Sequence, residues 1–142
     1  GLARGYTRAS AHGDGPPPTT GPERDNLATR PARGSAAGGS YSTLADLLSF
    51  DRALVGGKLV GAGWSAWVTG GPPPTAGGSL APEVPSFGFA GGAPGLNAEW
   101  SHEGDIVCIV LTNRDPEAAM PTVQGVRDIV RRMKPGGKRV RS

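Results

Sequence analysis

The sequence predicts an α+β fold, an antiparallel sheet of three strands in this chain flanked by helices. Leucines and valines recur at helical spacing near the middle and near the end of the chain, and strand-like segments lie between them over residues 86–113. The 24 glycines and 14 prolines are clustered and predict long loops around a compact centre. We expect residues 1–142 to form a single partial domain.

Residues 1–41 are expected to form a long irregular segment, because they show almost no hydrophobic periodicity. Pro16–Pro18 form a short polyproline run, and residues 34–40 are nearly all small. A structureless stretch of this length is unusual inside a compact domain unless it is functional or packs against other elements.

Residues 42–70 are expected to be helical. Thr43 can cap a first helix, and Asp46 completes a box-like pairing at its positive end. Gly56 and Gly57 end this helix, and a shorter helical piece is expected over residues 64–69. The apolar stripe of the first helix consists of Leu44, Leu47, Leu48, Leu54 and Val55.

Residues 86–113 are expected to form antiparallel strands at 87–90, 96–102 and 105–113, with a hairpin turn at Glu103-Gly104. Residues 106–111 are apolar at every position, which predicts a central strand covered by helices on both faces. With only three strands, such a strand would leave an apolar edge in water. We therefore expect strands from elsewhere in the protein, or from another chain, to complete the sheet.

A C-terminal helix is expected over residues 121–133, with Pro121 in its first turn. The formal net charge of +3 comes largely from the last dozen residues, including the basic tail 134–142. No aromatic residue is interleaved with these charges, so we interpret them as a helix end and a solvated tail and expect no nucleic-acid partner. The single cysteine, Cys108, lies in an apolar run and is expected to be a small core residue.

No complete catalytic or metal-binding motif occurs in the chain. It contains no GxSxG, SxxK, paired CxxC or HExxH, and its glycine-rich stretch leads into a strand rather than a helix. The two histidines are His12, in the irregular segment, and His102, which lies beside Glu103 and Asp105 and is expected to be a solvated turn residue. We expect no metal and no cofactor.

Three segments in order nevertheless resemble the C-terminal half of the β-lactamase-related serine hydrolases, which include class C β-lactamases, penicillin-binding D,D-peptidases and esterases. They are ARGYT at residues 3–7, AAGGSYSTLADL at 36–47, and FGFAGGAPGLNAEWSHEGDIVCIVLTN at 87–113. The resemblance covers nearly the whole chain. It implies the C-terminal part of a β-lactamase/transpeptidase-like fold and hydrolysis of an ester or amide through an acyl-enzyme.

The family's nucleophilic serine and lysine (SxxK) and its YxN tyrosine would all precede Gly1, so this chain alone is expected to be inactive. The family's third motif, [K/H]xG, aligns with Phe89-Ala90-Gly91, which implies a strand that lines the substrate. The backbone N–H of Gly92 would be one oxyanion-hole donor. Phe89 cannot relay a proton or bind a carboxylate, which favours an esterase over a β-lactamase or a D,D-peptidase.

Two other functions stay open from the sequence. One is a catalytically inactive homologue or binding module, because Phe89 replaces the usual cation. The other is a small α+β protein that self-associates through an exposed strand edge. The partner expected from the resemblance is a small ester or amide substrate, once the N-terminal half completes the site. The compartment is not indicated, since the family allows periplasmic, secreted and cytoplasmic proteins.

Overall fold

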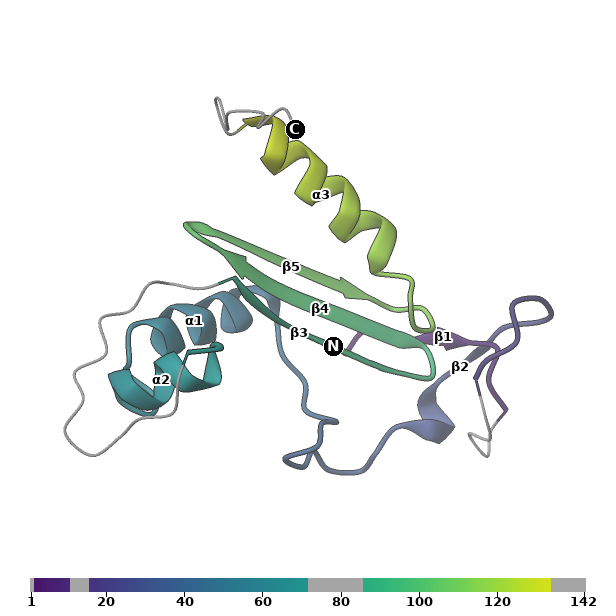
Figure 1. Cartoon of the computed structure of the whole chain (residues 1–142). Coiled ribbons are helices and arrows are strands. Elements are labelled where there is room, and N and C mark those ends of the chain that lie inside the picture. Colours follow the sequence, from purple (N-terminus) through teal and green to yellow (C-terminus); the bar gives the residue numbers. More distant parts are fainter. Residues whose placement is uncertain (1, 11–15, 72–85, 134–142) are drawn as a thin grey trace.

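The computed structural model describes residues 2–10, 16–71 and 86–133 and confirms the predicted α+β class (Figure 1). It contains a three-strand antiparallel sheet, a separate two-strand pair and three α-helices. The strands are β1 (Tyr6–Thr7), β2 (Arg24–Asp25), β3 (Phe87–Ala93), β4 (Leu96–Glu103) and β5 (Ile106–Thr112). The helices are η1 (Leu27–Thr29), α1 (Leu44–Val55), α2 (Ala62–Val68) and α3 (Met120–Met133).

The main sheet has the strand order β3-β4-β5, so β4 is its central strand. The prediction that residues 106–111 form the central strand is therefore wrong for the described residues. Both faces of β5 are apolar because α1 packs against one side of the sheet and α3 against the other. The β4–β5 turn is Gly104-Asp105, one residue later than predicted, with Gly104 at φ +63°.

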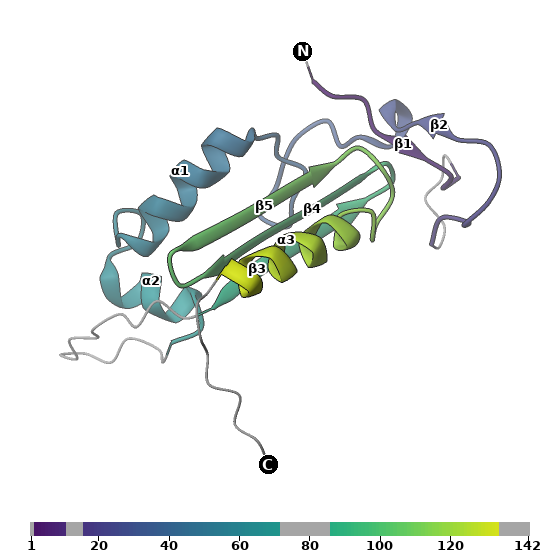
Figure 2. The same cartoon turned by 90° about the horizontal axis from the view of Figure 1, so that it is seen from above.

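The helices lie on opposite sides of the sheet. Figure 1 shows α3 above the strands and α1 and α2 below them, and Figure 2 shows α3 running over the sheet while α1 lies to one side. Because side chains alternate along a strand, each strand contributes to both layers. We call the two surfaces of the sheet the α1 face and the α3 face.

The start of α1 follows the predicted capping box. The Asp46 N–H donates to Thr43 Oγ1 at 3.1 Å, and the Thr43 N–H donates to Asp46 Oδ2 at 3.2 Å. Gly56 follows as the C-terminal cap, and α2 corresponds to the predicted shorter helical piece. Helix α3 starts at Met120, with Pro121 in its first turn as predicted.

The N-terminal segment is less irregular than predicted, because β1, β2 and η1 lie within residues 1–41. It packs at the end of the sheet that carries the β3–β4 turn (Figure 1). Asn26, only 2% exposed, donates from Nδ2 to the Pro94 carbonyl at 3.1 Å and accepts the Gly5 N–H at Oδ1 at 3.2 Å. Periodicity could not indicate this packing, because the contacts are made by single polar side chains and backbone groups.

The buried apolar core is small. Within the described residues, the buried hydrophobic side chains are Ala9, Leu54, Ala119 and Val123, whereas Trp64, Phe89 and Leu111 are each more than 40% exposed. A domain of this size normally buries most of its large apolar side chains. The described layers therefore leave much apolar surface uncovered.

The predicted basic tail, His12 and the proline-rich residues 72–75 lie outside the described residues. No helix in the described part of the chain is long and apolar enough to cross a membrane.

Candidate functional site

The candidate site is the free edge of β3. Ala93 and Leu96 are paired across the Pro94-Gly95 turn. Ala93 and Leu96 form a hydrogen-bonded pair, in which the N–H of each residue donates to the carbonyl of the other. If they were instead a non-bonded pair, Pro94 would have to donate a backbone N–H, which proline lacks. Bonded and non-bonded pairs alternate in an antiparallel ladder, so Gly92 directs its N–H and C=O away from β4. In the described residues no strand pairs with this edge.

The same alternation places Gly88 and Ala90 with Gly92 in the non-bonded pairs. The free edge of β3 therefore presents three backbone N–H groups and three carbonyls. The geometry is compatible with the donor role predicted for Gly92, although its partners in an oxyanion hole are not in this chain.

The two glycines Gly91 and Gly92 have different surroundings. A Cβ on Gly91 would meet no atom within 4 Å, so the α1 face is open at this position. A Cβ on Gly92 would lie 2.6 Å from Pro116 Cγ on the opposite face. The open space at Gly91 fits the expectation that this strand lines the substrate, because a position without a side chain lets a ligand approach the backbone.

Phe89 lies on the α1 face two residues before Gly91 and is 49% exposed. Its ring stacks on Trp100 with centroids 5.3 Å apart and an interplanar angle of 27°. Phe87 makes edge contacts with both rings at 6.4 and 5.6 Å. Ala90 is on the other side of the strand, so the predicted site residues are neighbours in the chain but do not share one face.

A buried carboxylate supports these rings from α1. Asp51, 1% exposed, accepts the Trp100 indole N–H at 2.8 Å. Its two oxygens also lie 3.0 Å from His102 Nδ1, within hydrogen-bond distance. His102 in turn stacks on Phe87 at 5.0 Å and 12°. Phe50 of α1 contacts Trp100 edge-on with ring centroids 5.6 Å apart. We call Phe50, Phe87, Phe89, Trp100 and His102 the aromatic cluster.

The prediction that His102 is a solvated turn residue is wrong. His102 belongs to β4, its exposed fraction is 7%, and its partner Asp51 is 51 positions earlier in the chain. The sequence signal that could have found this pair is the polar residue Asp51 within the apolar side of a helix, since buried charges need partners.

A polar cleft lies near the β3–β4 turn, at the end of β3 away from Phe87. It has a volume of about 420 Å³ and is lined by residues of the N-terminal segment and of the segment that follows β5. Glu23 pairs with Arg8 at 2.7 Å and also with Arg114, whose guanidinium lies 5.7 Å from the centre of the Tyr6 ring. Both arginines already have a carboxylate partner, so among the described residues that line the cleft no cation is left unpaired for a ligand.

Asp115, which also lines this cleft, holds the N-terminal segment against the sheet. It accepts the N–H groups of Arg8 and Gly95 at 2.9 and 2.8 Å. Burial works to raise the pKa of Asp115, but hydrogen bonds from the Thr7 hydroxyl and from these two N–H groups, with the charge of Arg8, outweigh it. The net result is a pKa below the usual value, which marks a carboxylate stabilised in its charged form.

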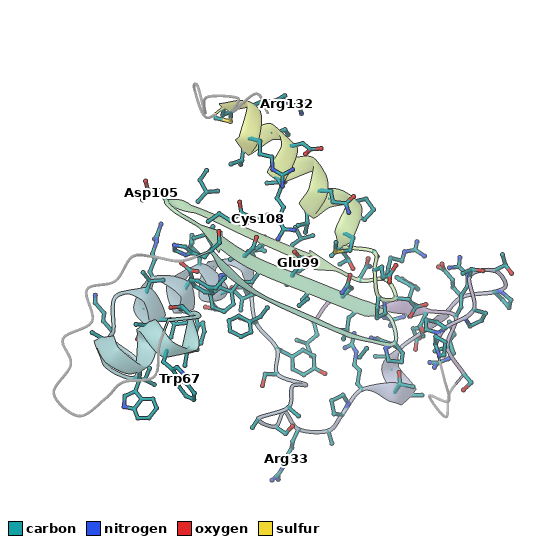
Figure 3. The ribbon with its side chains drawn as sticks, viewed as in Figure 1. Arg33, Trp67, Glu99, Asp105, Cys108 and Arg132 are labelled. Atoms are coloured by element: carbon teal, nitrogen blue, oxygen red, sulfur yellow. The ribbon has the colours of Figure 1, made fainter. Side chains whose placement is uncertain are left out.

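The α3 face carries a second charged group of residues. Arg127 of α3 lies 3.2 Å from Glu99 and 3.3 Å from Glu103, both on β4. Figure 3 shows Glu99 and Cys108 on the side of the sheet that faces α3. Burial raises the pKa of the Cys108 thiol, against the opposing charge of Arg127. Cys108 is only partly buried, less than expected for a core residue.

Within the described residues, no three His, Cys, Asp or Glu side chains come together in a way that could hold a metal ion. Comparison of the chain with family models, with curated proteins and with solved structures finds no match in any of the three.

Proposed function

We propose that this chain is the C-terminal part of a serine hydrolase related to β-lactamases and transpeptidases. In this proposal an N-terminal part supplies the serine nucleophile and completes the fold. The reaction is hydrolysis of an ester or amide through an acyl-enzyme. β3 forms one wall of the active site, and this chain without the N-terminal part has no hydrolytic activity.

The observation that carries the proposal is the direction of the Gly92 N–H. A donor on a free strand edge can bind the oxyanion of a tetrahedral intermediate, because no partner in the described part of the sheet uses it. The open space at Gly91 supports the same role, since a substrate can approach the backbone there without meeting a side chain.

The small core gives independent support. Large apolar side chains such as Leu44, Phe50 and Leu111 are exposed in the described structure. A second part of the protein that packs against the sheet and α1 would cover such surface, as expected if the hydrolase domain is larger than these residues.

The first test is the coding sequence upstream of Gly1, where the proposal expects an SxxK followed by a YxN. The second is hydrolysis of a p-nitrophenyl ester by the protein that includes this upstream part. Gly92→Pro removes the donor and should lower kcat by about 10²- to 10³-fold.

Two matched variants serve as controls for the effect of Gly92→Pro on kcat. Gly92→Ala keeps the N–H but introduces the contact with Pro116, and Ala90→Pro removes a different outward N–H from the same edge. If either control lowers kcat as much as Gly92→Pro, or if the upstream motifs are absent, the proposed role of Gly92 is wrong.

The free edge of β3 also favours a second candidate, self-association of the chain by strand pairing. Unpaired N–H and C=O groups at Gly88, Ala90 and Gly92 form a template for another strand. Analytical ultracentrifugation of the 142-residue chain should then show dimers that Ala90→Pro converts to monomers. A stable, folded monomer would exclude this candidate.

A further inference from the structure

We propose that the hydrolase site accepts neutral esters in which one methylene group joins an aromatic ring to the ester carbonyl, with the ring bound against Phe89 and above Gly91. The inference rests on the proposed function, because it places the reacting carbonyl at the Gly92 N–H. It adds the substrate class, which the direction of that N–H does not determine.

The first argument is the exposed ring of Phe89. Phe89 stacks on Trp100 at 5.3 Å and contacts Phe87 at 6.4 Å, yet 49% of the residue stays exposed. A second ring placed there gains a stacking or edge contact worth about 1 kcal/mol beyond the burial of its surface.

The second argument is the space beside that ring. Gly91 follows Phe89 on the same face, about 7 Å further along the strand, and has open space where a side chain would be. A planar ring fits above this bare backbone in contact with Phe89. An ester carbonyl joined to that ring through one methylene group would lie one residue from the outward N–H of Gly92.

The α1 face of β3 and β4 is also suited to an uncharged substrate. On the α1 face, the side chains of β3 and β4 are apolar or aromatic apart from His102, which is occupied by Asp51. The described strand residues of this face thus offer no free cation to a substrate carboxylate. A neutral ester has no charge that needs such a partner.

Asp51 acts as a positioning residue for this surface. It fixes Trp100 through the indole N–H and His102 through Nδ1, and these two rings stack on Phe89 and Phe87 respectively. The carboxylate is buried beneath the aromatic cluster and orients the rings without contacting the substrate.

The experiment compares methyl phenylacetate with methyl cyclohexylacetate, and with the monomethyl ester of phenylmalonic acid, which adds a carboxylate. The enzyme is the protein that includes the upstream part. We expect kcat/KM for the phenyl ester to exceed that for the cyclohexyl ester about tenfold, and the charged ester to be the poorest substrate.

Phe89→Leu keeps an apolar side chain and should reduce the phenyl preference about three- to tenfold through a higher KM. Phe89→Lys should improve the charged ester relative to the neutral one. Asp51→Ala should reduce the phenyl preference, and Asp51→Asn should restore part of it, because the amide oxygen still accepts from Trp100. The control is Trp67→Leu on α2, an exposed aromatic outside the cluster, which should leave the preference unchanged.

Hydrolysis without a phenyl preference, or with a preference that Phe89→Leu does not change, overturns the substrate class and leaves the proposed function intact. Absence of any ester or amide hydrolysis by the protein that includes the upstream part overturns the proposed function. In that case ring-proton NMR of the 142-residue chain tests separately whether Phe89 binds the phenyl ester. Shifts of Phe89 with methyl phenylacetate but not with the cyclohexyl ester support the aromatic site, and no shift rejects it.

Discussion

Asp51 on α1 accepts the indole N–H of Trp100 on β4 at 2.8 Å, although 49 positions separate the two residues in the chain. The contact joins the helix layer to the central strand of the sheet. Since Asp51 is 1% exposed and also lies 3.0 Å from His102, this carboxylate links α1 to two rings of the aromatic cluster.

Replacing Asp51 by alanine should lower the free energy of unfolding by about 3 kcal/mol, because the half-buried indole N–H of Trp100 and the buried His102 ring lose their hydrogen-bonding partner. Asp51→Asn should recover part of this loss. Urea unfolding followed by tryptophan fluorescence measures both. Asp128→Ala on α3 is the control, since its side chain is 61% exposed and the expected change is below about 0.5 kcal/mol. Equal effects at the two positions would contradict the role of Asp51.

Stability should fall in acid through Asp115. Its pKa is lowered in the folded chain, so the ionised form stabilises the fold above the unfolded pKa of about 4 and this contribution is lost as the pH falls through the folded value. Asp115→Asn should therefore lower stability at pH 7 and reduce its dependence on pH below about 4. Urea midpoints between pH 2 and 7 measure the effect. A variant with the same acid dependence as the parent chain would exclude Asp115 as its source.

Gly5→Ala should destabilise the chain strongly. A Cβ there would lie 2.0 Å from the Gly95 carbonyl oxygen and 2.5 Å from Asn26 Nδ2, and the backbone oxygen belongs to the tight β3–β4 turn. We expect a loss of about 2 kcal/mol or more in the free energy of unfolding. Thermal unfolding by circular dichroism tests this, and an unchanged Tm would show that the N-terminal segment does not pack there.

Gly125→Ala should raise the stability of the chain, in contrast to Gly5→Ala. Gly125 is inside α3 and a Cβ on it would meet no atom within 4 Å. Alanine should stabilise the helix by about 0.5–1 kcal/mol, because glycine loses more backbone entropy on folding. The same thermal unfolding experiment measures it, and a lower Tm would indicate an obstructed helix surface at this position.

The Cys108 thiol should react slowly with thiol reagents, because its raised pKa leaves little thiolate. Arg127 opposes this shift while Glu99 and Glu103 add to it, so Arg127→Met should slow the reaction further, about severalfold at pH 8. Labelling with Ellman's reagent measures the rate. Arg131→Met, whose side chain is 75% exposed on the same helix, should leave the rate unchanged; a faster reaction in Arg127→Met would reverse the assigned sign.

Local signals predicted much of the fold. The capping box at Thr43 and Asp46, the three antiparallel strands and the helix after Pro121 all depend on residues within one turn or hairpin. The strand order was not predicted in the same way, because an apolar run such as residues 106–111 has the same pattern whether neighbouring strands or helices cover it.

The candidate site, like the fold, was predicted only where it depends on residues that are close together in the chain. The glycines of β3 were visible in the sequence, whereas the support of Phe89 by Trp100 and Asp51 depends on pairing between distant elements. His102 shows the limit most clearly, since its chain neighbours Glu103 and Asp105 suggested solvent while its actual partner is on α1. The role of Gly92 stays a prediction.

The contacts of the N-terminal segment also bear on the order in which the chain can fold. The Tyr6 N–H donates to the Asn113 carbonyl, and the Arg8 N–H donates to Asp115 across 107 positions of sequence. During synthesis from the N-terminus, β1 can pair with β2 early, but the N-terminal segment cannot reach Asn113 and Asp115 until β5 and the segment after it have left the ribosome. Closing such long loops is slow, so the first residues dock among the last steps of folding. Chaperones therefore have time to act on the nascent chain before this docking.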